Sequence, residues 1–323
     1  MRNLANTLAY VEYVTATSKL DALPDFAKEY CYEIDGWVMP KLNPKRFLDD
    51  LKNYEVRSDD TYLITWPKSG TTWMQNILTL IFANGDMDAV REKHLFDRVP
   101  FLEMPQGLDY KKAENDNGLY EIARDMPSPR ILKTQLPPPF LPSQLEEKKP
   151  KIVYVARNPK DAAVSHFHFC NVSPALPQYR DWNDFFIDFC NDSIPRGSWF
   201  ENVFYWWNKR NEPNVLFITY EEMKKDLRAS VVRVCEFLGK DLSEEIIDVV
   251  TENSTFAAMK KDPKSNPDSL PIFKEAVKQK RSFLRKGEVG DWKNHFTVAQ
   301  NEIFDDLYRE KTEGTDVNFT FQL

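Results

Sequence analysis

A cation, a glycine and three hydroxyl side chains follow one another in the segment 67–73 (PKSGTTW), directly after a short apolar run. Lys68 supplies a full positive charge, and Gly70 permits a close approach of the backbone to a ligand. The hydroxyl groups belong to Ser69, Thr71 and Thr72. If a helix begins here, its unpaired N–H groups and its dipole favour an anion such as phosphate. The alternative interpretation is an ordinary capped helix start.

The order of residues in this segment also bears on the type of nucleotide site. In the Walker A motif the lysine follows a glycine-rich stretch at a fixed spacing. Here Lys68 precedes Gly70, and that spacing is missing. A kinase or another enzyme that hydrolyses ATP or GTP is therefore disfavoured.

Several apolar runs alternate with helical patterns and would position this turn. The runs that predict strands span residues 61–66, 131–134, 151–156 and 214–219. Helical spacing predicts helices over 71–83 and 221–238, the second ended by Gly239. This alternation predicts an α/β fold: a central parallel sheet flanked by helices, with a P-loop-like nucleotide-binding core at the carboxyl ends of the strands. We expect the proline-rich segment 136–142 to be a rigid loop and the polar segment 262–280 to be a mobile surface loop.

The composition is that of a soluble globular protein and limits the kinds of partner. Of the 323 residues, 42% are hydrophobic and 29% are charged, which indicates one domain over 1–323 with an N-terminal extension of uncertain order over 1–36. The net charge of −7 gives no overall positive field, so we expect neither nucleic acid nor a membrane as a partner. No run of about 18 apolar residues is present to cross a bilayer.

The cysteines and the N-terminus indicate a cytoplasmic protein. The scattered cysteines form no CxxC pair, which argues against a zinc cluster or a disulfide framework and favours a reducing compartment. They are Cys31, Cys170, Cys190 and Cys235. Residues 1–20 have neither a basic start nor a continuous apolar core, so they do not resemble a secretory signal.

Three stretches together resemble the cytosolic sulfotransferase family. WPKSGTTW at 66–73 is similar to the family's loop for the 5′-phosphosulfate of its donor, 3′-phosphoadenosine 5′-phosphosulfate (PAPS). Residues 155–161 (VARNPKD), with Ser165 beyond them, resemble its 3′-phosphate segment, and 285–293 (RKGEVGDWK) resembles its C-terminal signature. The stretches occur in the family's order, and the similarity runs from about Trp37 to the C-terminus. The resemblance implies a PAPS-dependent sulfotransferase that releases the bisphosphate PAP and needs no metal.

The resemblance also implies which residues bind the donor. Arg157 follows a predicted strand, and its planar guanidinium matches a phosphate group, whereas a lone arginine in this place is more often part of a surface ion pair. Arg285, Lys286 and Gly287 would close over the same phosphate, and Trp73 and Phe256 would stack on the adenine. The full expected set is Lys68, Ser69, Gly70, Thr71, Thr72, Trp73, Arg157, Ser165, Tyr220, Ser254, Phe256, Phe283, Leu284, Arg285, Lys286 and Gly287.

The expected catalytic residues are Lys68, Lys133 and Gln135. Charge grows on the phosphate oxygen that leaves during sulfonate transfer, so positioned cations lower the barrier. Lys68 is the candidate on the bridging oxygen, and Lys133 resembles the family's second catalytic lysine. In the family a histidine two residues after that lysine acts as general base, but this chain has Gln135, whose amide cannot take a proton near neutral pH. A positioned base contributes about 10²–10⁴ in rate.

Four hypotheses follow from Gln135. The protein is a slow or specialised sulfotransferase for acidic hydroxyls, or His166 or His168 acts as the base although helix packing is the more ordinary role for both. Alternatively the glutamine is an engineered His-to-Gln change that inactivates the enzyme, or the chain is a pseudoenzyme that binds PAP or PAPS without transferring sulfonate. We rank the active transferase first.

The resemblance places an apolar acceptor pocket and a dimer motif. The acceptor would be a small phenol, alcohol, steroid or amine. The side chains expected to line its pocket, unless they are plain core, are Trp37, Phe101, Met104, Phe140, His168 and Phe169. Residues 293–302 fit the family's KxxxTVxxxE pattern, which predicts a weak homodimer, the alternative being an ordinary helix start at Thr297. The residues of this motif are Lys293, Thr297, Val298 and Glu302.

Overall fold

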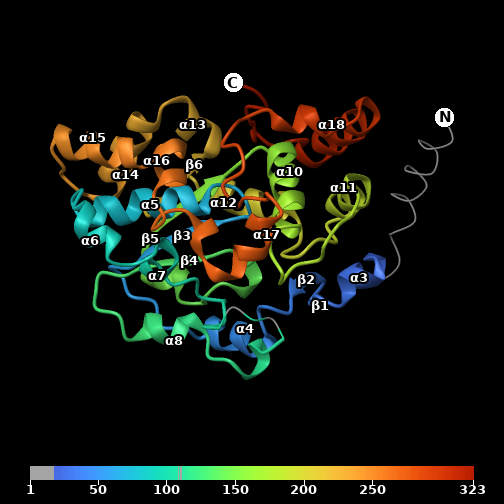
Figure 1. Ribbon diagram of the computed structural model, residues 1–323, viewed down its shortest axis with the longest axis horizontal. Helices are drawn as coiled ribbons and strands as arrows, with labels where there is room; N and C mark the ends of the chain where they lie inside the picture. The colour runs from blue at the N-terminus through green and yellow to red at the C-terminus, as the bar shows by residue number, and fades with distance from the viewer. Residues whose placement is uncertain (1–17, 108, 110) are drawn as a thin grey trace.

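A parallel four-stranded sheet carries the segment 67–73 at the carboxyl edge of one of its inner strands (Figure 1). The computed structural model describes residues 18–107, 109 and 111–323. The strand order is β4-β3-β5-β6, and all neighbouring pairs are parallel. The strands are β3 (Thr61–Thr65), β4 (Ile131–Thr134), β5 (Lys151–Ala156) and β6 (Val215–Thr219). The four predicted strands and the α/β fold class are confirmed.

Alternate residues of the strands pack into two separate cores on the two faces of the sheet. On β3, Tyr62 and Ile64 join the larger core, whereas Leu63 joins the other. The larger core is covered by α4 (Lys45–Lys52), α10 (Pro159–Cys170), α11 (Trp182–Cys190), α12 (Trp199–Asn208) and α18 (Val298–Thr312). The smaller core is covered by α5 (Thr71–Phe82), α14 (Leu227–Leu238) and α15 (Glu244–Asn253). The strands are buried on both faces, as their almost continuous apolar sequences require.

An antiparallel hairpin and short helices complete the chain. The hairpin pairs β1 (Cys31–Ile34) with β2 (Trp37–Pro40). The remaining α-helices are α2 (Lys19–Ala22), α3 (Asp25–Lys28), α6 (Met87–Arg91), α7 (Leu95–Arg98), α8 (Leu119–Arg124), α9 (Leu145–Lys148), α13 (Tyr220–Lys225), α16 (Phe256–Lys261) and α17 (Lys274–Lys278). The 3-10 turns are η1 (Ala113–Asn115), η2 (Pro138–Phe140), η3 (Pro267–Ser269), η4 (Pro271–Phe273) and η5 (Asp291–Asn294). No helix in the described ranges is long and apolar enough to span a membrane.

The N-terminal extension predicted over 1–36 falls partly outside the described residues. Residues 1–17 lie outside them, whereas residues 18–36 contain α2, α3 and β1. Leu23 and Ala27 of this part pack against Cys31 and Val38 of the hairpin in a small apolar cluster. The described part of the extension is thus folded onto the first hairpin.

Three predicted segments differ in detail from the structure. The helix predicted over 221–238 is divided into α13 and α14, because Asp226 adopts an extended conformation and its carboxylate accepts a hydrogen bond from the N–H of Ala229 to cap α14. Gly239 ends α14 in the left-handed conformation, as predicted. The proline-rich segment 136–142, predicted as a rigid loop, contains the short 3-10 turn η2 (Pro138–Phe140). The segment 262–280, predicted as a loop, contains η3, η4 and α17.

Candidate functional site

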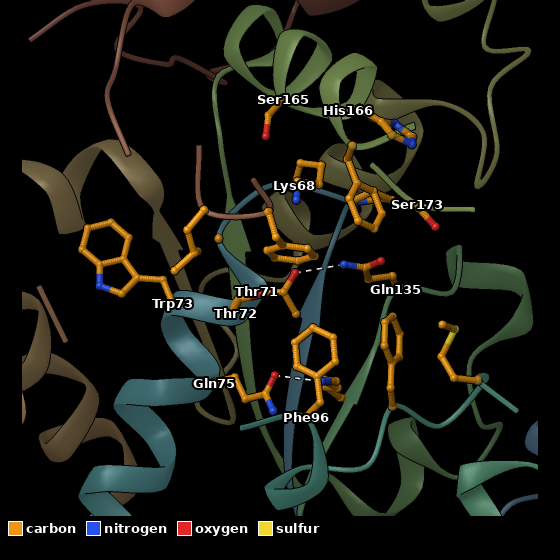
Figure 2. Close-up of a pocket in the computed structure, with 18 of the residues that line it drawn as sticks. Lys68, Thr71, Thr72, Trp73, Gln75, Phe96, Gln135, Ser165, His166 and Ser173 are labelled. Atoms are coloured by element: carbon orange, nitrogen blue, oxygen red, sulfur yellow. Dashed lines mark hydrogen bonds between the residues drawn. The ribbon is translucent and has the colours of Figure 1, made fainter. Parts of the chain in front are cut away.

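A cavity of about 430 Å³ opens beside the carboxyl ends of β3, β4 and β5 (Figure 2). Its walls come from the turn after β3, the residues that end β4, the helix α10 and the segment 283–288. These segments are far apart in sequence and meet because parallel strands bring their carboxyl ends to one edge. The cavity therefore lies where ligands bind in sheets of this type.

The turn after β3 has the backbone of an anion-binding loop. Gly70 is the N-cap of α5 at a φ of 119°, and a Cβ atom there would lie 3.2 Å from the ring of Tyr220. Thr71 and Thr72 begin the helix, so the N–H groups of its first turn lack intrahelical partners. Ser69 is completely buried, and its Oγ has no hydrogen-bond partner among the described residues. A buried hydroxyl without a partner fits a site that receives a polar ligand.

Lys68 points its ammonium group between two aromatic rings of the cavity wall. Its Nζ lies 4.2 Å from the ring centroid of Phe169 and 3.9 Å from that of Phe283. Burial, followed by the charges of Arg157 and Arg285, lowers the pKa of Lys68 to about 7. An anion bound beside Lys68 would restore its charge, because an opposite charge favours the protonated form.

Lys133 is the second lysine of the cavity and lies at the end of β4. Its Nζ donates a hydrogen bond of 2.7 Å to Oε1 of Gln75 and lies 4.6 Å from the ring centroid of Phe96. Burial lowers the pKa of Lys133 to about 7, although Glu103 and Asp97 act in the opposite direction. Two lysines with weakened affinity for protons thus face one cavity.

Gln135 is held at both its backbone and its side chain. Its Nε2 donates a hydrogen bond of 2.9 Å to Oγ1 of Thr71, as Figure 2 shows, and its backbone N–H donates one of 2.7 Å to Glu103. Thr71 Oγ1 in turn lies 2.6 Å from Oγ1 of Thr65. Glu103 is fully buried and is also paired with Arg196. The amide therefore belongs to a neutral hydrogen-bond chain that joins β4 to the anion loop.

Arg157 connects the anion loop with the C-terminal segment. Its guanidinium donates hydrogen bonds to the carbonyl of Glu288 at 2.9 Å and to that of Lys68 at 3.4 Å. It also stacks over Tyr220, with 4.2 Å from Cζ to the ring centroid. The buried Nε of Arg157 has no partner in the described part of the chain. A donor of this type suits an anion oxygen.

Asp291 holds Arg285 and Lys286, the two cations that were expected to close over the same phosphate as Arg157. Arg285 donates to it at 2.5 Å, Lys286 also donates to it, and Asn294 donates at 2.9 Å. Burial opposes the ionisation of Asp291, but the hydrogen bonds from Lys286, Asn294 and Arg285 lower its pKa to about 2. The neighbouring Asp161 accepts hydrogen bonds from the backbone N–H groups of Gly290 and Trp292 and so fixes the same segment.

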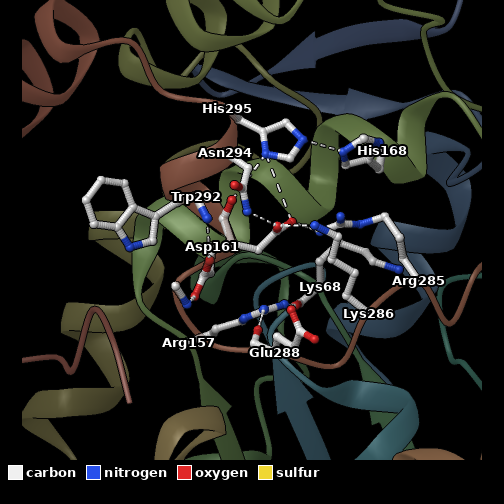
Figure 3. A network of polar contacts seen from close by, with 12 residues as sticks. Lys68, Arg157, Asp161, His168, Arg285, Lys286, Glu288, Trp292, Asn294 and His295 are labelled. Atoms are coloured by element: carbon white, nitrogen blue, oxygen red, sulfur yellow. Dashed lines mark hydrogen bonds and ion pairs between the residues drawn. The ribbon is translucent and has the colours of Figure 1, made fainter.

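His166 and His168, the two alternative candidates for the base, lie in different surroundings. His166 lines the cavity, but its ring packs against Trp66 and Phe185, and burial lowers its pKa to about 3. The Nε2 of His168 lies 2.8 Å from that of His295 (Figure 3), and His168 lines a different cavity. His168 was expected in the acceptor pocket; its place on α10, two residues after His166, turns it away from that pocket.

Most of the other predicted site residues line the cavity. They are Lys68, Gly70, Thr71, Thr72, Trp73, Phe101, Met104, Lys133, Gln135, Arg157, Ser165, Phe169, Tyr220, Phe256, Phe283, Leu284, Arg285, Lys286 and Gly287. Ser69, Ser254, Trp37 and Phe140 are not among its lining residues. The carbonyl of Ser254 accepts a hydrogen bond of 2.6 Å from the indole of Trp73 and so positions that ring. Trp37 and Phe140 pack edge to face on each other, 6.5 Å between centroids.

Several lining residues were not found from the sequence. Gln75 lies one helical turn after Thr71, so helical spacing carried a signal for it. Phe96 lies in the short helix α7, and Gln106 and Ser173 lie in irregular segments; as single aromatic or polar side chains they gave no pattern. Arg196 has a positive φ of 76° and reaches the cavity from the segment that precedes α12.

Comparisons with known proteins show which family the chain belongs to. A family model described as the sulfotransferase domain matches residues 58–316. Sulfotransferase 1C2 of Rattus norvegicus is 40% identical over 279 residues, which cover 84% of this chain and 90% of that protein. A mouse sulfotransferase (SULT7A1) complexed with PAP superposes with a TM-score of 0.72 and 30% identity, covering 89% of this chain and 96% of the other. Retinol dehydratase in complex with retinol and PAP gives a TM-score of 0.77 and 26% identity, covering 88% and 90%.

The family model spans most of the chain, and the curated relative matches it over nearly its whole length. The resemblance of the three sequence stretches to sulfotransferases is thereby confirmed. The chain belongs to the sulfotransferase domain family.

Proposed function

We propose that the protein transfers the sulfonate group of PAPS to a hydroxyl or amine of a small apolar acceptor and releases PAP. The observation that carries the proposal is the meeting of Lys68, Lys133 and Arg157 in one cavity at the carboxyl edge of the sheet. Sulfotransferase relatives and solved neighbours complexed with PAP support the same reaction class. The four cysteines are free thiols, which suits a reducing compartment such as the cytosol.

We call residues 68–73 the anion loop, and Arg157, Ser165 and residues 285–287 the phosphate clamp. The donor fits the polar groups that these two parts of the cavity leave without partners. The buried Ser69 Oγ and Arg157 Nε are both hydrogen-bond donors for phosphate oxygens. Trp73 and Phe256 offer aromatic faces in the same cavity for the adenine. We therefore assign the 5′-phosphosulfate to the loop 68–73 and the 3′-phosphate to Arg157, Ser165 and the segment 285–287.

In the proposed reaction the acceptor oxygen forms a bond to sulfur while the bond from sulfur to the phosphate oxygen breaks. The leaving oxygen gains negative charge, and Lys68 and Lys133 are the cations in the cavity that stabilise it. Pre-positioned charges in a site shielded from water are worth more than the same charges in solution. The acceptor also loses a proton, for which Gln135 offers no basic atom.

The acceptor would occupy the apolar part of the cavity. Phe101, Met104 and Phe169 line it together with Phe96 and Leu176. Apolar walls with a few polar groups select a ligand that has one reactive polar end. Retinol dehydratase is solved in complex with PAP and with retinol, which is an apolar alcohol of this type.

A second candidate function is a nucleotide-binding protein that no longer transfers sulfonate. The hydrogen bond from Gln135 to Thr71 and the burial of His166 favour it, because Gln135 is not basic and the His166 ring is packed among aromatic side chains. We place the transferase first, since both lysines retain their positions. Acceptors with acidic hydroxyls, which lose their proton readily, are the ones expected to react.

Replacing Lys68 by methionine tests the role of the loop cation. We expect Lys68→Met to lower the rate of sulfonate transfer at least about 100-fold, because removal of one donor to a developing oxyanion costs about 10²–10³ in rate. The measurement is transfer of labelled sulfonate from PAPS to a panel of phenols and alcohols. Lys45→Met on the exposed start of α4 is the control and should keep the wild-type rate. Transfer by Lys68→Met at more than half the wild-type rate would contradict the assignment.

Restoring a histidine tests the missing base. We expect Gln135→His to raise the transfer rate at least tenfold, because a positioned general base contributes about 10²–10⁴. Gln106→His is a matched control, because Gln106 lines the same cavity but does not lie two residues after Lys133. An unchanged or lower rate in Gln135→His would mean that the proton transfer is handled by another group or does not limit the rate. No transfer by either protein, together with tight PAP binding, would establish the second candidate.

The lowered pKa of Lys68 predicts how PAP binding depends on pH. Below pH 7 Lys68 is charged in the unliganded protein, and above pH 7 the ligand must bind together with a proton. We therefore expect the Kd of PAP to rise between pH 7 and 9, by up to about tenfold per unit, with proton uptake. Phosphate groups titrate near pH 6, so the ligand itself does not change charge in this window. Calorimetry in two buffers of different ionisation enthalpy measures both quantities, and a Kd that stays constant would refute the prediction.

The expected homodimer motif surrounds the start of α18. Val298 is 77% exposed at the first position of α18, and Thr297 caps that helix. An exposed valine beside Lys293 and Glu302 can meet its own copy across a two-fold axis. We expect Val298→Glu to raise the dimer dissociation constant at least tenfold in analytical ultracentrifugation. Val277→Glu, at another exposed valine, is the control, and equal behaviour of the two variants would argue against the motif.

A further inference from the structure

A second cavity, about 770 Å³ in volume and open to solvent, is lined by basic side chains and by no acidic side chain of the described residues. Its cations come from the loop before α11, the end of α16 and the chain after α17: Arg180, Lys260, Lys280, Arg281 and Arg285. We call this the basic groove; its other lining residues are Phe167, His168, Asn171, Val172, Gln178, Tyr179 and Ser282. The chain has 50 acidic and 43 basic residues, so the charge of this lining is opposite in sign to the net charge of the protein. A smaller cavity that contains Lys149 also contains Glu146 and Glu212.

Four of the five cations of the basic groove form no ion pair with a carboxylate of the described residues. Arg180, Lys260, Lys280 and Arg281 are exposed, and none of them forms an ion pair within residues 18–107, 109 and 111–323. Arg285 is paired with Asp291. A concave surface lined by one sign of charge concentrates the field and attracts ions of the opposite sign.

The basic groove adjoins the proposed donor cavity through one short segment. Lys280, Arg281 and Ser282 line the groove, whereas Phe283 and Leu284 line the donor cavity. Arg285 lines both. An anion in the basic groove would therefore contact Arg285, which belongs to the phosphate clamp together with Arg157 and Lys286.

We propose that the basic groove is an encounter site that attracts the anionic nucleotide and passes it to the donor cavity at Arg285. The proposal rests on the proposed function, since the nucleotide is the donor or its bisphosphate product. A protein of net charge −7 repels such an anion at long range, so capture requires a local field of positive sign. Exposed cations on long side chains that form no ion pair suit this task, because they act mainly on the association rate and less on the tightness of binding.

The test compares two double variants that remove the same charge from different places. Arg180→Gln with Lys280→Gln weakens the groove without touching the donor cavity. Lys52→Gln with Lys149→Gln is the control, since both lysines line the smaller cavity and Lys149, like Lys280, has a positive φ. Stopped-flow tryptophan fluorescence would follow the binding of PAP over a range of salt concentrations.

We expect the groove variant to bind PAP about three to ten times more slowly than the control at low salt. The difference should vanish near 0.5 M salt, where charges are screened within about 4–5 Å, and the dissociation rates should agree within about twofold. Equal association rates in the two variants, or a change confined to dissociation, would overturn the encounter site. Failure of the wild-type protein to bind PAP would instead overturn the proposed function, so the two failures are distinct.

Discussion

The turn between β3 and α5 passes through backbone conformations that most residues avoid. Lys68 has a φ of 65° and Gly70 one of 119°, so the chain reverses sharply and delivers a lysine and a helix start to one point. A side chain at Gly70 would press on Val155 and Tyr220, the first from β5 and the second from the start of α13. The loop is therefore defined by contacts with two further elements of the fold, a strand and a helix. The positions of Lys68, Thr71 and the cavity all follow from this packing.

Burial of like charges is the second constraint on the site. Arg157 and Arg285 lie close enough to Lys68 that each of them disfavours its positive charge. No carboxylate in the described residues is paired with Lys68 or Lys133. Such an arrangement is unfavourable in the unliganded protein and becomes favourable when an anion arrives. Electrostatic strain of this kind is typical of functional sites rather than of structural ion-pair networks. The Arg130–Asp60 pair, fully buried and mutually neutralising, shows the structural alternative in the same molecule.

The parts of the fold that depend on local pattern could be predicted from the sequence. The strands at 131–134 and 151–156 and the start of the helix at Thr71 agree with the structure, because apolar runs and turn residues mark them directly. The break at Asp226 could not be predicted with the same ease, since the apolar stripe continues across it. His168 and Arg196 depend on how distant segments pack. The first points to His295, and the second reaches the cavity from an irregular segment, so neither position is visible in local periodicity.

Asp291 would give the proposed phosphate clamp an internal stand-in for its ligand. Arg285 and Lys286 both hold its carboxylate, and the same aspartate accepts a hydrogen bond from Asn294. In the proposed reaction, the departure of the product would therefore not leave two neighbouring cations without an anionic partner. The clamp would exchange one anion for another with little rearrangement of its backbone. Turnover in such a protein would depend less on rebuilding the empty site than on how quickly each nucleotide escapes from it.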